Sequence, residues 1–446
     1  MNRSRNYCPD IEEFYFLKLK NIWTFFKGQH FSFIMICCYL FFEYARPQAI
    51  FPFIDFLPWA QLFLIGSLAG AVVDRSVKWV SSPINVFMIL FAIIILISSL
   101  NAVYPKISQD HYIDFYSWFV VYFLIINIVN TKQRFYVFLL IFMLCAAKIS
   151  ISLSQTWAFR GFSFTSWGLK GPRGYFQNSG ELSILMLTLF PVAYHLYQLL
   201  KDKVSKVEKY ILILFWVTPI LVVLGASSRG SQLALAIQLM VIFRKHIFKI
   251  KPLITVVVLC TLLYHLLPEE QKQRFEEAGT DKTSQQRLLY FENGWKMMQK
   301  YPGLGVGYFN FPKYFENYYP EDMLYDKAEL PHNIFIQVGT DTGFTGLFIF
   351  LFLLLLPFWL SRRKKLDPDK DKFMHITITG VLQGLLGFII AGQFVTVTYY
   401  PFLWISLAFV VAGHNVYRLQ HNPKKQHNQL SKEPFATNGE PRFGSR

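Results

Sequence analysis

Long runs of apolar residues alternate with short polar segments along most of this chain. Runs of about 17–25 apolar residues are long enough to cross the hydrocarbon core of a bilayer as helices. We therefore expect an all-α polytopic membrane bundle with about 12 transmembrane helices. The predicted spans lie at residues 31–47, 56–73, 83–101, 115–130, 133–153, 181–200, 208–226, 229–243, 250–267, 333–360, 375–393 and 398–417.

The same pattern divides the chain into five parts. Residues 1–30 form an N-terminal segment, and the first nine predicted spans follow within residues 31–267. A large loop rich in polar and aromatic residues occupies residues 268–332. The last three spans fall within residues 333–417, and we expect the polar tail at residues 418–446 to be disordered.

The composition is that of a membrane protein. Of the 446 residues, 53% are hydrophobic and only 16% are charged, whereas about a quarter of the residues in a soluble protein are charged. The net charge is +16, and the basic residues cluster in short loops between apolar runs. Loop topology explains that distribution better than nucleic-acid binding does, so we expect no nucleic-acid partner.

Lysine and arginine residues are concentrated in every second loop, beginning with the N-terminal segment. Basic loops face the cytoplasm. We therefore expect both termini to be cytoplasmic and the large loop at residues 268–332 to lie on the outer face. The other basic loops contain Arg75 and Lys78; Lys132 and Arg134; Lys201, Lys203, Lys206 and Lys209; Arg244, Lys245, Lys249 and Lys251; and Arg362, Arg363, Lys364 and Lys365.

Several basic residues oppose this trend, and Arg173, Arg229 and Arg287 are among those in segments that we expect on the outer face. Arginine binds phosphate through paired hydrogen bonds, so anion binding is one reason to place it there. The alternative is a solvated charge on a loop. That alternative suits Arg229 poorly, because this residue lies between two apolar runs.

Three predicted spans begin at the outer face with residues that cap helices. Asn178 precedes the sixth span, two serines precede Arg229 at the eighth, and Asn333 opens the tenth. A helix start offers free N–H groups and partial positive charge to an anion. If the three starts converge, they form one anion site with Arg173 and Arg229, but the sequence alone does not show convergence.

His332 lies where the large loop re-enters the membrane. The positive end of a helix disfavours a protonated imidazole. A neutral histidine beside an anion site is suited to act as a general base. The alternative is an interfacial histidine that only caps the helix.

The large loop contains a predicted amphipathic helix from Thr283 to Met298. Thr283 and Gln286 resemble a capping box at its start. We expect its apolar stripe to pack against the membrane domain. The stripe consists of Leu288, Phe291, Trp295 and Met298.

An ordered set of short motifs resembles the O-antigen ligase and polymerase family. The set comprises Gly171-Pro172-Arg173-Gly174 with Asn178; Ser228-Arg229-Gly230; Arg287, Trp295 and Tyr301-Pro302-Gly303-Leu304-Gly305-Val306-Gly307; and His332-Asn333 with Gly339, Gly343 and Gly346. The resemblance extends along residues 83–415 and does not need the N-terminal third. Where family members often have glutamate before a glycine, this chain has Thr340-Asp341, so no role is carried onto that position.

The resemblance implies a glycosyltransferase of the bacterial inner membrane whose active site faces the periplasm. Such an enzyme transfers a glycan from a polyprenyl (undecaprenyl) pyrophosphate carrier, with inversion and without a metal or cofactor. The acceptor is lipid A–core for a ligase, which the overall layout slightly favours. It is another carrier-linked glycan for a polymerase, or a protein for related enzymes.

The residue pattern and the resemblance together assign candidate roles. The candidate catalytic residues are His332, Arg229 and Arg287. Candidates for binding the pyrophosphate or the glycan are Arg173, Asn178, Asn333 and Trp295. No spacing typical of metal ligands is present, so we expect no metal. The competing class is a transporter or flippase for lipid-linked glycans, but the sequence lacks the internal repeats typical of transporters.

Overall fold

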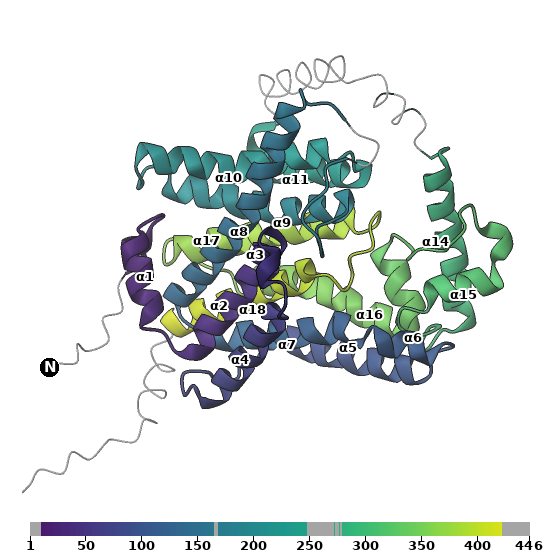
Figure 1. The fold of residues 1–446 in the computed structure, drawn as a ribbon. Coiled ribbons are helices and arrows are strands. Elements are labelled where there is room, and N and C mark those ends of the chain that lie inside the picture. Colours follow the sequence, from purple (N-terminus) through teal and green to yellow (C-terminus); the bar gives the residue numbers. More distant parts are fainter. Residues whose placement is uncertain (1–9, 165–167, 248–271, 273–275, 277–278, 422–446) are drawn as a thin grey trace, which may run out of the picture.

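The computed structural model describes residues 10–164, 168–247, 272, 276 and 279–421. These residues form helices joined by turns and loops, with no strand among them. Helix α1 (Leu19–Lys27) lies at one end of the bundle, and α14 (Lys282–Lys300) and α15 (Phe311–Tyr318) lie at the other end (Figure 1). The prediction of an all-α membrane bundle is confirmed.

Eight helical stretches of the described chain are long and apolar enough to cross a membrane, and each coincides with a predicted span. They are α5 (Pro83–Leu100), α6 and α7 (Pro105–Asp110 and Tyr112–Ile128), α8 (Lys132–Phe159), α9 (Ser179–Leu200), α10 (Lys206–Gly225), α16 (Ile334–Arg363), α17 (Lys372–Ala391) and α18 (Pro401–His421).

Three other predicted spans are also helices, although they are not among the eight that are long and apolar enough to cross a membrane. Helices α2 (Phe31–Tyr44) and α4 (Trp59–Val73) have 14 and 15 residues. At about 1.5 Å per residue they are shorter than the hydrocarbon core of about 30 Å. Helix α11 (Arg229–Ile247) has 19 residues and carries basic residues at both ends. The span at 250–267 lies outside the described residues, so the total of 12 stays a prediction.

The remaining elements are short helical turns. In chain order they are η1 (Ile11–Phe14), α3 (Pro47–Ile50), η2 (Pro52–Ile54) and η3 (Pro320–Asp322).

Helices α9 and α18 form the centre of the bundle. In each of them 78% of an 18-residue apolar stretch is buried inside the protein. A helix that is apolar on all sides and buried contacts other helices rather than lipid. Accordingly, α9 packs against α10 and α17, and α18 packs against α7 and α17.

Contacts between loops show which loops lie together at each end of the bundle. At one end, Lys132 forms an ion pair with Asp371 at 2.8 Å. At the other end, the backbone N–H of Val103 donates to the carbonyl of Val306 at 2.9 Å, which joins the α5–α6 connection to the large loop. This grouping is the one that the alternation of basic loops predicts. Which end faces the cytoplasm stays a prediction.

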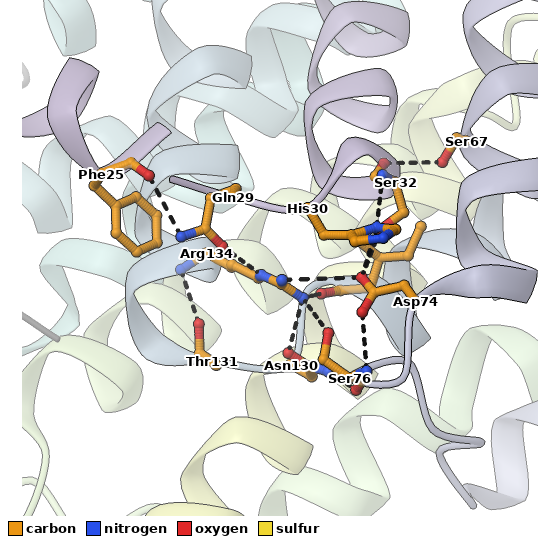
Figure 2. Close-up of polar contacts among 11 residues, drawn as sticks. Phe25, Gln29, His30, Ser32, Ser67, Asp74, Ser76, Asn130, Thr131 and Arg134 are labelled. Carbon is orange, nitrogen blue, oxygen red and sulfur yellow. Dashed lines mark hydrogen bonds and ion pairs between the residues drawn. The ribbon is translucent and has the colours of Figure 1, made fainter. Parts of the chain in front are cut away.

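A buried ion pair holds the N-terminal helices together at the end that contains Lys132 (Figure 2). The Arg134 guanidinium donates to Gln29 at 2.8 Å and to Ser76 at 3.1 Å, and it lies 4.0 Å from the Asp74 carboxylate. Asp74 also accepts a hydrogen bond from Ser32 at 2.7 Å. These contacts join α2, the α4–α5 loop and α8, and the hydrogen bonds reduce the cost of burying the two charges.

Helix α14 begins one residue before the predicted start, and its cap differs from the prediction. The carboxylate of Asp281 accepts the N–H of Ser284 at 3.0 Å, so Asp281 rather than Thr283 is the N-cap. The proposed capping box of Thr283 and Gln286 is therefore wrong. The Gln286 side chain instead accepts the N–H of Leu324 at 2.6 Å, which holds the end of the large loop against the helix.

The prediction that the apolar stripe of α14 packs against the membrane domain is correct only in part, for Met298 against Gly339 and for the edge of Trp295 against Phe344 of α16. Leu288, Phe291 and Trp295 are 59%, 47% and 45% exposed. Of the four stripe residues only Met298 is buried. The helix instead turns Gly294 toward Ile336 on α16, where a Cβ atom at residue 294 would lie only 2.4 Å from the Ile336 side chain. Close approach to α16 decides which face is buried.

Helix α16 is broken at Gly343, which has φ 69°. The glycine-rich turn of the large loop enters this break, since the N–H of Phe344 donates to the carbonyl of Pro302 at 2.8 Å. Beside the break, the buried Asp341 carboxylate accepts the Tyr399 hydroxyl at 2.8 Å and the N–H of Phe309 at 3.0 Å. Asp341 therefore joins the large loop to the segment that precedes α18.

Candidate active site

Three helix starts converge on one short segment, residues 392–396, which is the first part of the connection between α17 and α18. At the start of α9, a Cβ atom on Gly180 would lie 2.8 Å from Val395. At the start of α11, a Cβ atom on Gly230 would lie 2.4 Å from Phe394. Only glycine permits these close approaches.

The start of α16 reaches the same segment through hydrogen bonds. The N–H of Ile334 donates to the carbonyl of Gly392 at 2.9 Å, and the N–H of His332 donates to the Thr396 hydroxyl at 3.1 Å. The structure therefore supplies the convergence that the sequence left open. It also identifies a segment between α17 and α18 that sequence reasoning did not assign to the site.

Arg229, the first residue of α11, is held by the start of α14. Its Nη2 donates to the Asp281 carboxylate at 3.0 Å and to the Ser284 hydroxyl at 3.2 Å. Burial favours the neutral carboxyl form, but hydrogen bonds from Ser284 and Arg229 outweigh it and lower the pKa of Asp281 to about 2. This ion pair fixes α14 over the helix starts. It also places the Asp281 carboxylate, which the sequence did not reveal, beside Arg229, a candidate anion-binding residue.

Arg287 interacts electrostatically with both pairs of the site, Arg229–Asp281 and His332–Glu329. Burial lowers the pKa of its guanidinium, and the nearby positive charge of Arg229 lowers it further. The carboxylates of Asp281 and Glu329 act in the opposite direction. The Nε of Arg287 is buried and has no hydrogen-bond partner among the described residues. Two neighbouring guanidinium groups with an unused donor favour a bound anion.

His332 is held by Glu329 in a defined orientation. The imidazole Nε2 lies 2.9 Å from the Glu329 carboxylate, while Nδ1 is buried and has no partner among the described residues. An ionised carboxylate can only accept, so Nε2 carries the proton and Nδ1 keeps its lone pair. Burial lowers the pKa of His332, the Glu329 hydrogen bond opposes this, and the charge of Arg287 lowers it further.

The backbone at His332 adopts an uncommon conformation. Its φ is 51°, in the left-handed region that residues with a side chain rarely occupy. Strained backbone of this kind is concentrated at functional sites, where surrounding contacts hold it in place. Here the hydrogen bonds to Thr396 and Glu329 hold the residue, and the N–H of Glu329 in turn donates to the Tyr290 hydroxyl at 2.9 Å.

Two of the predicted binding residues act as helix caps. The Asn333 side-chain oxygen accepts the N–H groups of Phe335 and Ile336 at 2.9 and 3.1 Å. The Asn178 amide donates to Glu181 at 3.1 Å. Because Glu181 already places a carboxylate at the start of α9, this helix start is less suited to a further anion.

The other two predicted binding residues lie apart from His332. Arg173 is exposed on the loop before α9, and no described contact joins it to Arg229, Arg287 or His332. Its neighbour Gly174 packs against the guanidinium of Arg46. Trp295 lies edge-on to Phe344, with ring centroids 5.6 Å apart. Eight residues separate it from Arg287 along α14, about 12 Å.

Sequence reasoning missed Glu329, Asp281 and Thr396. Glu329 stands three residues before His332, a spacing that gives a local signal for pairing. Asp281 and Thr396 give no such signal, because their partners are 52 and 64 residues away. In the part of the chain that the structure describes, His, Cys, Asp and Glu side chains do not gather in groups of three as a metal site requires.

Two family matches cover much of the chain. Residues 213–351 match the family described as O-antigen ligase. Residues 13–201 match a family of unknown function (DUF5935). No curated protein matches the chain. The first match contains Arg229, Arg287 and His332, whereas Arg173 and Asn178 fall in the second.

Proposed function

Because residues 213–351 place this chain in the O-antigen ligase family, we propose that it is a membrane glycosyltransferase acting on a glycan carried by polyprenyl pyrophosphate. The observation that carries the proposal is the His332–Glu329 pair beside Arg287 and Arg229. These groups provide a neutral base and two cations within one site. Transfer of a glycan from a pyrophosphate carrier needs both functions.

In the proposed reaction, His332 Nδ1 takes the proton of the acceptor hydroxyl while the hydroxyl oxygen forms a bond to the anomeric carbon. The bond between that carbon and the phosphate oxygen breaks, and the pyrophosphate leaves with the electron pair. Attack on the face opposite the leaving group inverts the anomeric configuration. Glu329 keeps the Nε2 proton in place and stabilises the imidazolium that forms.

Arg229 and Arg287 bind the pyrophosphate and stabilise the charge that develops on it. Asp281 holds Arg229 in place before the substrate enters. The helix dipoles at the starts of α11 and α16 add partial positive charge on the same side. The role requires no metal, since the two guanidinium groups carry the compensating charge.

We propose lipid A–core as the acceptor and the periplasmic face of the inner membrane as the location. The basis for the location is the alternation of basic loops, which assigns the end containing His332 to the outer face. The choice of lipid A–core over a carrier-linked glycan or a protein rests on the overall layout of the chain. We propose Arg173 and Trp295 as glycan contacts outside the reacting centre.

Reconstitution tests this function. The purified chain is placed in proteoliposomes with a polyprenyl-pyrophosphate-linked glycan and, separately, lipid A–core or a second carrier-linked glycan. A covalent glycan–lipid A–core product, absent with His332→Gln, is the expected result. Lengthening of the carrier-linked glycan identifies a polymerase instead. Movement of the glycan across the bilayer without any covalent product contradicts the proposal and supports a transporter.

A further inference from the structure

A polar cavity lies at the end of the bundle opposite His332. Its volume is about 350 Å³, and it is lined by the C-terminal ends of α16 and α18 and by residues just before α5. Its apolar wall includes Leu360 and Val411. Its basic wall is formed by Lys364, Lys365, Lys370 and Arg418, and we call the cavity the basic pocket.

Hydrogen bonds fix the loop that carries the lysines of the basic pocket. The N–H of Asp367 donates to the Tyr417 hydroxyl of α18 at 3.1 Å. Immediately before this loop, the Ser361 hydroxyl lies 2.9 Å from His414 Nε2 and joins α16 to α18. At the end of the loop, Asp371 pairs with Lys132. These contacts hold the helix ends and the loop around the basic pocket in place.

The positive charges of the basic pocket are incompletely balanced. Lys370 lies 3.9 Å from Asp367, and both side chains are largely exposed. Within the described part of the chain, no carboxylate is within ion-pair distance of Lys364, Lys365 or Arg418. Arg418 Nη2 donates to an asparagine, but its buried Nε has no partner among these residues.

Two general effects favour cations here and need to be separated from ligand binding. The C-terminal ends of α16 and α18 carry partial negative charge, and basic residues collect on the cytoplasmic side of membrane helices. Neither effect explains a cavity with an apolar wall. Since α16 and α18 are membrane spans that end at this level, the cavity lies at the boundary between hydrocarbon and water.

We propose that the basic pocket binds the headgroup of an anionic phospholipid. The phosphate lies among Lys364, Lys365 and Arg418, and the first part of the lipid chain lies against Leu360 and Val411. Basic pockets between membrane helices bind anionic headgroups in this way. The pocket is separate from the glycosyltransferase site, so this proposal does not depend on the proposed function.

Native mass spectrometry of the purified full-length chain tests the proposal. The detergent-solubilised protein is titrated with phosphatidylglycerol or with zwitterionic phosphatidylethanolamine. The test variant is Lys364→Gln with Lys365→Gln. The matched control, Arg362→Gln with Arg363→Gln, removes the same charge from the same helix end, but these two residues do not line the pocket.

We expect the test variant to bind phosphatidylglycerol about 30-fold more weakly, because each lysine near an anionic lipid surface contributes about fivefold. The control should bind nearly as the parent chain does, and phosphatidylethanolamine should bind weakly to all three. Equal loss in the test variant and the control contradicts the proposal. An absence of preference for phosphatidylglycerol in the parent chain also contradicts it.

Two further measurements keep the result interpretable. Inorganic phosphate at millimolar concentration is added as a competitor; if it displaces phosphatidylglycerol completely, the site takes free phosphate and the lipid assignment is wrong. Size-exclusion chromatography checks the folding of each variant. If the double variant is misfolded, Lys365→Gln alone replaces it, with Arg362→Gln as its control and a fivefold loss as the expected result.

Discussion

Glu329 holds the Nε2 of His332 at 2.9 Å, one turn before α16 begins. The opposite nitrogen, Nδ1, is buried and has no partner among the described residues. This pairing selects the tautomer that a general base requires, because the proton lies on the nitrogen that faces the carboxylate. The positive charge of Arg287 nearby disfavours the protonated ring.

Substitution of His332 tests the assignment of the base. His332→Ala should insert and bind the carrier lipid but transfer glycan about 10²–10⁴-fold more slowly, which is the usual cost of losing a general base. His332→Gln should be nearly as slow, since an amide cannot take the proton at neutral pH. Turnover in reconstituted vesicles is the measurement. Near-normal rates for the glutamine variant would mean that His332 only positions the acceptor.

The pH dependence of transfer tests the environment of His332. Burial and Arg287 lower the pKa of His332, so the neutral base persists below the usual histidine pKa of about 6.5. The rate should therefore fall only when the pH drops below that value. Arg287→Gln removes a positive charge and should move this acid limb to higher pH, in addition to slowing the reaction. An unchanged acid limb in Arg287→Gln contradicts the proposed coupling.

Glu329→Gln tests the positioning role of the carboxylate. The variant removes the anion that stabilises imidazolium, so the pKa of His332 should fall and the acid limb should move to lower pH. The maximal rate should drop by about 10–100-fold, the equivalent of one charge-assisted hydrogen bond. Glu316→Gln is a suitable control, because this glutamate also lies in the large loop but pairs with Lys313. An unshifted pH profile would reduce Glu329 to a structural role.

Substitutions in the Arg229–Asp281 pair distinguish anion binding by Arg229 from a purely structural role in docking α14. Arg229→Ala should nearly abolish transfer, and Arg229→Lys should restore it only in part, because lysine lacks the planar fork. Asp281→Asn keeps a good N-cap for α14 but removes the competing negative charge. It should therefore retain or strengthen binding of the carrier pyrophosphate. Loss of binding in Asp281→Asn equal to that in Arg229→Ala would indicate that the pair only docks α14.

Cysteine labelling tests the orientation of the two ends of the bundle. A membrane-impermeant maleimide added to intact cells should label Thr280→Cys, next to α14, and should not label Val207→Cys, at the exposed start of α10. The parent chain gives the background from its native cysteines. Labelling of Val207→Cys alone would place the candidate site on the cytoplasmic side and would contradict the proposed reaction.

The sequence alone was sufficient for properties that depend on local pattern. The length of an apolar run and the spacing of polar residues determine where α5, α9 and α16 lie, because a helix in lipid must satisfy its own backbone. The same local pattern identified Arg229, Arg287 and His332 as unusual, since Arg229 and His332 stand at the starts of predicted spans and basic residues in segments predicted to face outside oppose the trend of the other loops.

Tertiary structure alone decided how these residues meet. Residues 392–396 bring the starts of α9, α11 and α16 together, and Arg229 pairs with Asp281 across 52 residues of chain. Helix α14 buries its Gly294 face and leaves Trp295 partly exposed, because the shape of α16 selects the face that approaches most closely. Such choices depend on which distant surfaces fit, a property of the packed molecule that no local periodicity contains.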